Sequence, residues 1–87
     1  MSDTYYVYIL RSLKDGNFYT GHTSDIKDRL ARHNRGEVRS TKARRPFSLV
    51  YWEVFKTRSE AMKRERKLKL LKHEDKLKLV QMFKQAI

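Results

Sequence analysis

Hydrophobic residues dominate a short segment near the start of the chain, residues 5–11, YYVYILR. They fill both alternating sets of a strand: one set is Tyr6, Tyr8 and Leu10, and the other is Tyr5, Val7 and Ile9. Because successive strand residues point to opposite faces of a sheet, this pattern predicts a strand with both faces at least partly covered. The turn pair Asp15-Gly16 follows, so residues 17–22 are expected to return as the second strand of a hairpin.

The next hydrophobic positions have helical spacing. Asp25 is a suitable N-cap for a helix that runs to about Asn34, and Gly36 is a plausible stop. A loop then extends over residues 35–46, RGEVRSTKARRP, and ends at Pro46. This order of elements predicts a short helix between the hairpin and the rest of the chain.

The second half of the chain predicts one strand and two helices. Residues 47–55, FSLVYWEVF, are typical of a third strand. Thr57 and Glu60 form a capping box for a helix that runs to roughly Leu71. A third helix covers about residues 74–86, with an apolar stripe that should pack on the sheet: Leu79, Val80, Phe83 and Ile87. The fold class is therefore α+β.

Two polar residues interrupt the apolar stripe of the first helix. The positions i, i+3, i+4 and i+7 of this stripe are Ile26, Arg29, Leu30 and His33. One interpretation is that the edge of the stripe reaches solvent, so that the long arginine extends its charge into water. The other is that Arg29 and His33 line a pocket beside the sheet, since breaks in local consistency often mark functional sites.

The second helix carries an acidic residue between two apolar ones, because Ala61, Glu65 and Leu68 share one face. Glu65 either forms an exposed ion pair with Lys69 or serves as the lone protein ligand of a hard cation such as Mg²⁺, with phosphate and water completing the shell.

Two tyrosines, Tyr8 and Tyr19, fall on the strands predicted to be hairpin neighbours. Such pairs are usually cross-strand packing. Gly21, close to the end of the second strand, permits close approach of a ligand or of another backbone.

Composition narrows the class of partner. The chain has 87 residues, enough for one small domain, and its 21 Lys and Arg against 10 Asp and Glu produce a net charge of +11. Nucleic acid is the favoured partner of such a field; an anionic membrane surface or a merely soluble, highly charged protein are the alternatives. No segment approaches the roughly 20 apolar residues of a membrane span. The first residues lack an export signal, so a cytoplasmic protein is expected.

The chain contains no cysteine and three histidines, so disulfides, thiolate zinc sites and thiol nucleophiles are excluded. His22, His33 and His73 fall in different contexts, and we expect no structural metal.

Taken together, several short motifs resemble the GIY-YIG nuclease superfamily over about residues 5–70. They are YVY at residues 6–8, YTG at residues 19–21, Arg29, His33 and Glu65. Segment 41–65, TKARRPFSLVYWEVFKTRSEAMKRE, is similar to the small UPF0213-type proteins of that superfamily. Tyr6 replaces the glycine of the first motif and Thr20 the usual isoleucine of the second, and an asparagine that some members carry has no clear counterpart.

The resemblance implies a GIY-YIG-like three-stranded antiparallel sheet flanked by helices, in the order β-β-α-β-α-α, as one nuclease domain over residues 1–87. It also implies metal-dependent hydrolysis of phosphodiester bonds with Mg²⁺ or Mn²⁺ and without a small-molecule cofactor. In this reading Tyr8 is the general base and Tyr19 shares its hydrogen bonds. Arg29 stabilises the transition state, His33 assists proton transfer or orients the water, and Glu65 holds the metal.

The expected substrate is DNA, bound with weak sequence specificity; a preference for a structure such as a branch, a flap or an end is a further option. Binding should be mostly electrostatic, so that affinity falls with salt. The residues expected to contact nucleic acid are Gly21, Arg39, Lys42, Arg44 and Arg45, together with the lysine-rich second helix. The protein is expected to act as a monomer or weak dimer. Two alternatives stay open: a DNA- or RNA-binding domain of the same fold that cuts poorly or not at all, and a structural module that recruits a nuclease.

Overall fold

A computed structural model describes residues 4–86 of the chain. Its centre is an antiparallel sheet of three strands: β1 (Tyr5–Ser12), β2 (Phe18–Thr23) and β3 (Phe47–Phe55). The strand order is β2-β1-β3, so β1 lies in the middle. Gly16 has a φ of 75°, which supplies the left-handed turn residue between β1 and β2. The three predicted strands are confirmed: β3 has the predicted bounds, and the ends of β1 and β2 shift by at most one residue.

The first helix, α1, spans Ile26–Arg35. The side chain of Asp25 accepts a hydrogen bond from the Asp28 backbone N–H at 3.0 Å, and Gly36 closes the helix in the left-handed region at φ 80°. Both caps are local interactions that the sequence encodes within a few residues. The two caps fix where the helix begins and ends, and hence where Arg29 and His33 lie relative to the sheet.

The second helix, α2, spans Arg58–Lys69, and the third, α3, spans His73–Ala86. Thr57 caps α2 by accepting from the Glu60 N–H at 3.1 Å, as predicted. The helix ends two residues before the expected Leu71, because the N–H groups of Leu70 and Leu71 bond to carbonyls three residues back. Such bonds tighten the last turn and end the α-helical geometry.

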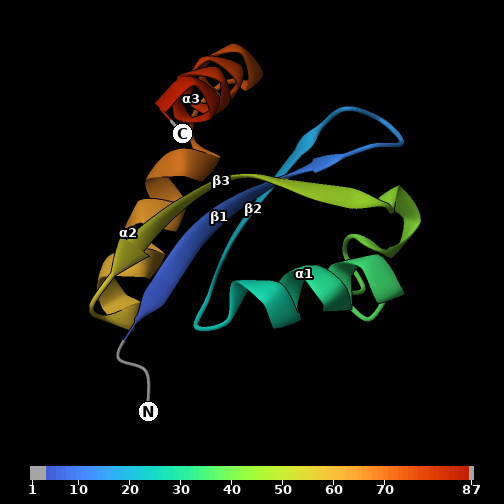
Figure 1. Ribbon diagram of the computed structural model, residues 1–87, viewed down its shortest axis with the longest axis horizontal. Helices are drawn as coiled ribbons and strands as arrows, with labels where there is room; N and C mark the ends of the chain where they lie inside the picture. Colours follow the sequence, from blue (N-terminus) through green and yellow to red (C-terminus); the bar gives the residue numbers. More distant parts are fainter. Residues whose placement is uncertain (1–3, 87) are drawn as a thin grey trace.

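Helices cover both faces of the sheet, as the double alternation in β1 predicts (Figure 1). On the α1 face the buried cluster is Tyr8, Leu10 and Phe47. On the α2 and α3 face it is Val7, Ile9, Tyr51, Ala61, Leu68 and Val80, with Leu79 and Phe83 packed against it. The apolar stripe of α3 therefore packs on the sheet as expected, apart from Ile87, which lies outside the described residues.

The loop between α1 and β3 is tied to the sheet. It contains a 3₁₀ turn, η1 (Lys42–Arg44), which was not predicted. The Ser12 hydroxyl donates to the Arg44 carbonyl at 2.6 Å, and the Asn34 amide makes hydrogen bonds with both backbone groups of Phe47 at 2.7 and 3.1 Å. These contacts place Thr41, in the same loop, against the C-terminal half of α1.

Candidate active site

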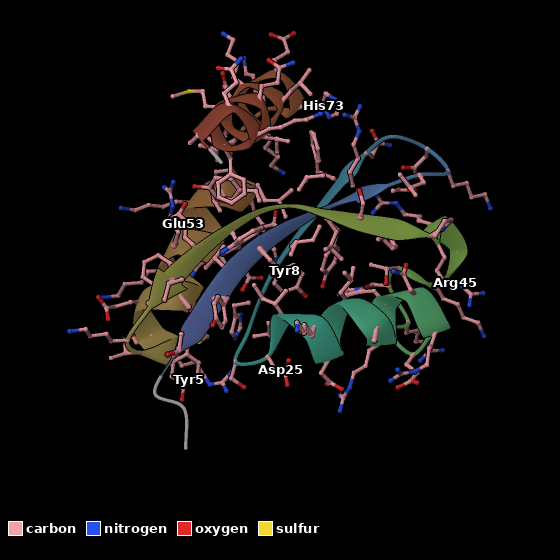
Figure 2. All side chains as sticks on the ribbon, in the orientation of Figure 1. Tyr5, Tyr8, Asp25, Arg45, Glu53 and His73 are labelled. Carbon is pink, nitrogen blue, oxygen red and sulfur yellow. The ribbon has the colours of Figure 1, made fainter. Side chains whose placement is uncertain are left out.

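Tyr8 lies at the centre of the candidate site. It projects from the middle strand toward α1, and its side chain is only 2% exposed (Figure 2). Gly21 is its register partner on β2, and a Cβ at Gly21 would lie 2.6 Å from the Tyr8 hydroxyl oxygen. The ring of Tyr19 lies beside it, with centroids 6.4 Å apart. The glycine of the YTG motif thus leaves the space that the tyrosine hydroxyl occupies.

A chain of hydrogen bonds starts at the Tyr8 hydroxyl. That oxygen lies 3.0 Å from Nε2 of His33, and Nδ1 of His33 lies 2.8 Å from the hydroxyl of Thr41. Thr41 donates its own proton to the Val38 carbonyl, at 3.3 Å, so it is free to accept from Nδ1–H. We infer that His33 carries its proton on Nδ1, which leaves Nε2 to accept from Tyr8.

Burial keeps the side chains of Tyr8 and His33 neutral near pH 7. Desolvation raises the pKa of Tyr8 to about 12, against the opposing effect of Arg29, and the nearby groups Tyr19 and Glu65 add to the rise. Desolvation and then the charge of Arg29 lower the pKa of His33 to about 4. Near pH 7 the Tyr8 phenolate and the His33 imidazolium are therefore both rare, and Nε2 of the neutral imidazole accepts a hydrogen bond from the Tyr8 hydroxyl.

Arg29 lies on the same face of α1 as His33 and is partly buried. Its interactions with the hydroxyl of Tyr8, and to a lesser extent Tyr19, raise its pKa despite burial. Within residues 4–86, its buried Nε atom has no hydrogen-bond acceptor. A buried donor without a partner is costly, and an anion supplied from outside would satisfy it. Arg29 and His33 thus line a polar site beside the sheet.

Glu65 comes from α2, which packs on the opposite face of the sheet, but its carboxylate lies close enough to Tyr8 to help raise the pKa of the tyrosine hydroxyl. One carboxylate oxygen lies 2.5 Å from Nδ1 of His22, and the other lies 2.7 Å from the ammonium of Lys69. Burial opposes ionisation, but Lys69 and His22 outweigh it and lower the pKa of Glu65. The ion pair with Lys69 is present as expected, yet the Glu65 side chain is only 15% exposed, so the pair is not a simple surface contact.

His22 and Thr41 are site residues that the sequence analysis did not select. His22 follows Gly21 on β2, and strand alternation alone places it on the face opposite Tyr8, where α2 packs. That alternation was available in the sequence, but the partner on α2 is 43 residues away. For Thr41 we find no local pattern that distinguishes it from the other polar residues of its loop.

The residues around Glu65 fit a single hard cation that takes one carboxylate ligand from the protein. The carboxylate is ionised, and one of its two partners, Lys69, is about half exposed and therefore able to move away. In the described part of the chain, no three His, Cys, Asp or Glu side chains gather as a metal cage. A cation at this position would take Glu65 as its carboxylate ligand and fill its shell from water and phosphate, as Mg²⁺ commonly does.

Comparison with known proteins identifies the family of the chain. The model of the GIY-YIG catalytic domain matches residues 4–78 of the chain. The chain belongs to the GIY-YIG catalytic domain family. A UPF0213 protein of Staphylococcus saprophyticus is 48% identical over 79 residues, which cover 90% of this chain and 95% of the relative. A UPF0213 protein of Staphylococcus aureus is 44% identical with the same coverage.

A solved structure agrees with the fold. The solution NMR structure of a UPF0213 protein from Bacillus halodurans is 40% identical to this chain, with a TM-score of 0.57. The alignment covers 91% of this chain and 84% of that one. The expected α+β fold and the expected family are therefore confirmed. The GIY-YIG domain is that of a nuclease family, and such a domain implies binding of nucleic acid.

The basic residues of the loop in this GIY-YIG domain have different environments. Arg39 and Lys42 are exposed. Arg44 donates to Asp15 at 3.0 Å and to the Phe18 carbonyl at 3.5 Å, so it braces the β1–β2 hairpin. Arg45 is exposed, although its Nε donates to the Lys42 carbonyl at 2.9 Å. Across residues 4–86, none of the helices has the length and apolar character required to cross a bilayer.

Proposed function

We propose that this protein is a metal-dependent endonuclease that hydrolyses phosphodiester bonds in DNA with weak sequence specificity. The observation that carries the proposal is the chain Tyr8–His33–Thr41, whose tyrosine hydroxyl interacts with the guanidinium of Arg29. Within residues 4–86, the buried Nε of that guanidinium has no acceptor. The arrangement combines an acceptor for a proton with a donor for an anion in one buried site. In a purely structural core, a buried guanidinium donor without a partner would lower stability and gain nothing.

The attacking group is a water molecule held at the Tyr8 oxygen. As its oxygen forms a bond to phosphorus, its proton passes to the Tyr8 oxygen while the tyrosine proton moves to Nε2 of His33. The bond from phosphorus to the leaving oxygen breaks, and that oxygen takes a proton from solvent. Because the pKa of His33 is about 4, the imidazolium is short-lived and Nε2 returns its proton to the Tyr8 oxygen. The proton that Tyr8 took from the water is then released to solvent, which balances the proton taken up by the leaving oxygen.

Arg29 supplies charge-assisted hydrogen bonds to the non-bridging oxygens, where negative charge grows in the transition state. Glu65 would hold Mg²⁺ or Mn²⁺, which when bound neutralises the phosphate and stabilises the leaving oxygen. His22 fixes the orientation of that carboxylate. The exposed cations Arg39, Lys42 and Arg45 contact phosphates away from the reacting centre, which positions the backbone without reading bases.

The test is cleavage of labelled linear, branched, flapped and supercoiled DNA, and of RNA, with Mg²⁺ or Mn²⁺ and with EDTA. Tyr8→Phe should lower the rate constant of cleavage by roughly 10²- to 10⁴-fold, the usual contribution of a general base. Glu65→Gln should abolish metal-dependent cleavage while DNA affinity changes little.

Matched controls are Tyr5→Phe, on the opposite face of the same strand, and Glu60→Gln, on the same helix as Glu65. Both should cleave like wild type. Equal cleavage by wild type and Glu65→Gln would overturn the proposal. Tight binding without cleavage of any substrate would favour the alternative, a nucleic-acid-binding domain of this fold.

A further inference from the structure

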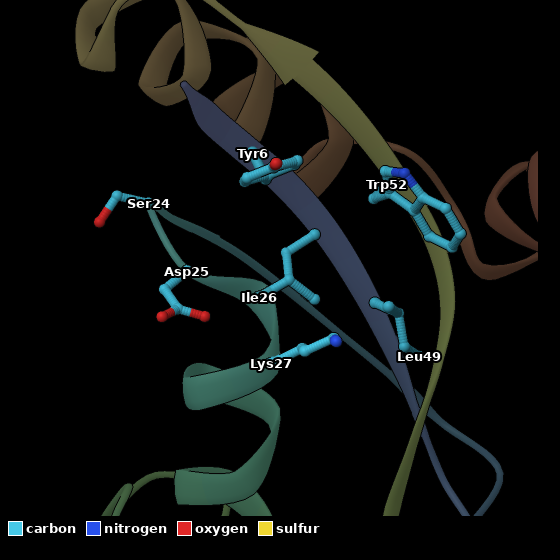
Figure 3. A pocket seen from close by; sticks show the side chains of 7 residues that line it. All are labelled: Tyr6, Ser24, Asp25, Ile26, Lys27, Leu49 and Trp52. Carbon is cyan, nitrogen blue, oxygen red and sulfur yellow. The ribbon is translucent and has the colours of Figure 1, made fainter. Parts of the chain in front are cut away.

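A cavity opens beside the candidate active site, on the face of the sheet that α1 covers. Its volume is about 400 Å³, within the roughly 300–1,000 Å³ of pockets that hold small organic ligands (Figure 3). Two aromatic rings, Tyr6 and Trp52, flank it, and Ile26 and Leu49 complete its apolar lining. Asp25 and Lys27 stand at the α1 side. The walls are thus mainly apolar and aromatic, with charges of both signs nearby.

The cavity adjoins the residues that would act on phosphate. Tyr6 precedes Tyr8 by two positions on β1, so the two rings leave the same face of the strand about 7 Å apart. Trp52 is the register partner of Tyr8 on β3. On α1, Ile26 lies one turn before Arg29. A phosphate at Arg29 would therefore have this cavity as its immediate neighbour.

The two rings that flank the cavity are partly exposed. The indole of Trp52 is held by an edge-on contact with Phe83 on α3, with ring centroids 4.7 Å apart and planes at 71°. A rigid aromatic surface next to a phosphate site suits a nucleobase, because every base has a face that stacks.

We propose that this cavity takes one unpaired nucleobase, whose neighbouring phosphate lies at Arg29 and Tyr8. The base enters between Tyr6 and Trp52, and Lys27 lies at its polar edge on the α1 side. Bases inside a duplex are stacked on one another and cannot enter, so the pocket selects nucleic acid with a flap, a bulge or a single-stranded end. This inference rests on the proposed function and names the feature of the substrate that the site recognises.

The experiment measures binding in EDTA, where cleavage does not interfere. The probes are a short duplex with a single unpaired adenine, the same duplex with an abasic residue at that position, and the fully paired duplex. Wild type should bind the first about five- to a hundredfold more tightly than the second, the range expected for stacking of one base. When 2-aminopurine replaces the unpaired adenine, its fluorescence should be quenched on binding.

Tyr6→Leu and Trp52→Leu should lose the difference between the first two probes and keep the affinity for the paired duplex. Tyr5→Leu, the matched change on the other face of β1, should keep both the difference between the two probes and the affinity for the paired duplex. Equal affinity of wild type for the base-containing and abasic probes would overturn the inference, and that comparison needs no variant to fold. Failure to cleave with metal would refute the proposed hydrolysis alone, whereas failure to bind nucleic acid would refute both proposals.

Discussion

The Tyr8 hydroxyl and Nε2 of His33 lie 3.0 Å apart, although 25 positions separate the two residues. The contact joins the middle strand of the sheet to α1, and His33 is fully buried. Thr41 completes the arrangement from the other side of the imidazole. The hydroxyl of Thr41 thereby determines which nitrogen of His33 is free to accept the tyrosine proton.

Thr41→Val is expected to remove the hydrogen-bond acceptor for Nδ1–H of His33 without changing the size of the side chain. Nδ1–H of His33 would lose its acceptor, so the tautomer with the proton on Nε2 would gain population and Tyr8 would lose its proton acceptor. We expect kcat to fall about 10- to 100-fold, the range seen when partners that orient functional groups are removed. ¹⁵N NMR of the His33 ring should report the change of tautomer.

Thr41→Ser is the matched control, because it keeps the hydroxyl and should keep both the Nδ1–H tautomer and the rate. A Thr41→Val protein with wild-type kcat and an unchanged ¹⁵N spectrum would show that Thr41 does not position the imidazole. Loss of affinity for DNA with unchanged kcat would also contradict this role.

His33 should make stability fall in acid. The unfolded chain protonates this imidazole below about pH 6.5, but the folded protein does so only below about pH 4. Between these two pH values the unfolded state binds more protons than the folded state, so the free energy of unfolding rises with pH. The stability that neutral His33 contributes is therefore fully present above pH 6.5 and is lost as the pH falls to 4. The full loss is about 3 kcal/mol.

Urea unfolding of wild type and His33→Gln across that range measures this contribution. The variant is less stable at neutral pH, but its stability should depend less steeply on pH between about 6.5 and 4. Parallel pH profiles for the two proteins would mean that His33 is protonated equally in the folded and unfolded states.

The elements of this fold were predictable because the interactions that fix them are local. Alternation within residues 5–11 showed a strand covered on both faces, and caps at Asp25 and Thr57 showed where two helices begin. The spacing of α1 also placed Arg29 and His33 on the same helix face as Ile26 and Leu30, but it left open whether the two polar residues reach solvent or line a pocket. The end of α2 was placed two residues too late, because the tightening of its last turn leaves no residue signature such as a glycine.

The partners of the site residues were not predictable in the same way. The contact of His22 with Glu65 depends on how α2 packs across β2, and Thr41 reaches His33 only because its loop is anchored on the sheet. Both are consequences of tertiary packing rather than of a local pattern. The contacts of Arg44 with Asp15 and with the Phe18 carbonyl, which brace the hairpin, likewise depend on tertiary packing, and its expected contact with phosphate stays a prediction.

Gly21→Ala should disturb Tyr8 directly. The new Cβ would lie 2.6 Å from the hydroxyl oxygen and 2.8 Å from Cζ of a ring that is rigid and buried, so the ring has to move. Such overpacking costs about 1–3 kcal/mol of stability, and displacement of Tyr8 should lower kcat as well. Gly16→Ala is the control: it is strained at φ 75° but lies far along the hairpin, so it should lower stability and leave kcat unchanged. A Gly21→Ala enzyme with wild-type kcat would show that the position of the Tyr8 hydroxyl is not critical.

Lys69→Gln should strengthen binding of divalent cations. The ammonium of Lys69 occupies one oxygen of Glu65, and a metal has to displace it. Because the ion pair is half exposed, its removal should raise the affinity for Mn²⁺ by roughly two- to fivefold. Calorimetry or EPR titration with Mn²⁺ measures this without nucleic acid, and Lys67→Gln, with the same charge change on the same helix, should have a smaller effect. Weaker Mn²⁺ binding by Lys69→Gln would indicate that Glu65 is not the metal ligand.

The salt dependence of DNA binding should separate the basic residues of the loop by role. Arg39 and Lys42 are exposed, and replacing either by alanine should reduce the slope of log K against log salt by about 1, as expected for one lost phosphate contact. Arg44→Ala should mainly lower the melting temperature, because the hairpin loses the ion pair with Asp15. Lys78→Ala, the same loss of charge on α3, should leave the slope unchanged. If the alanine variants of all four residues, Arg39, Lys42, Arg44 and Lys78, shift the slope equally, the net charge of the protein rather than this loop governs DNA binding.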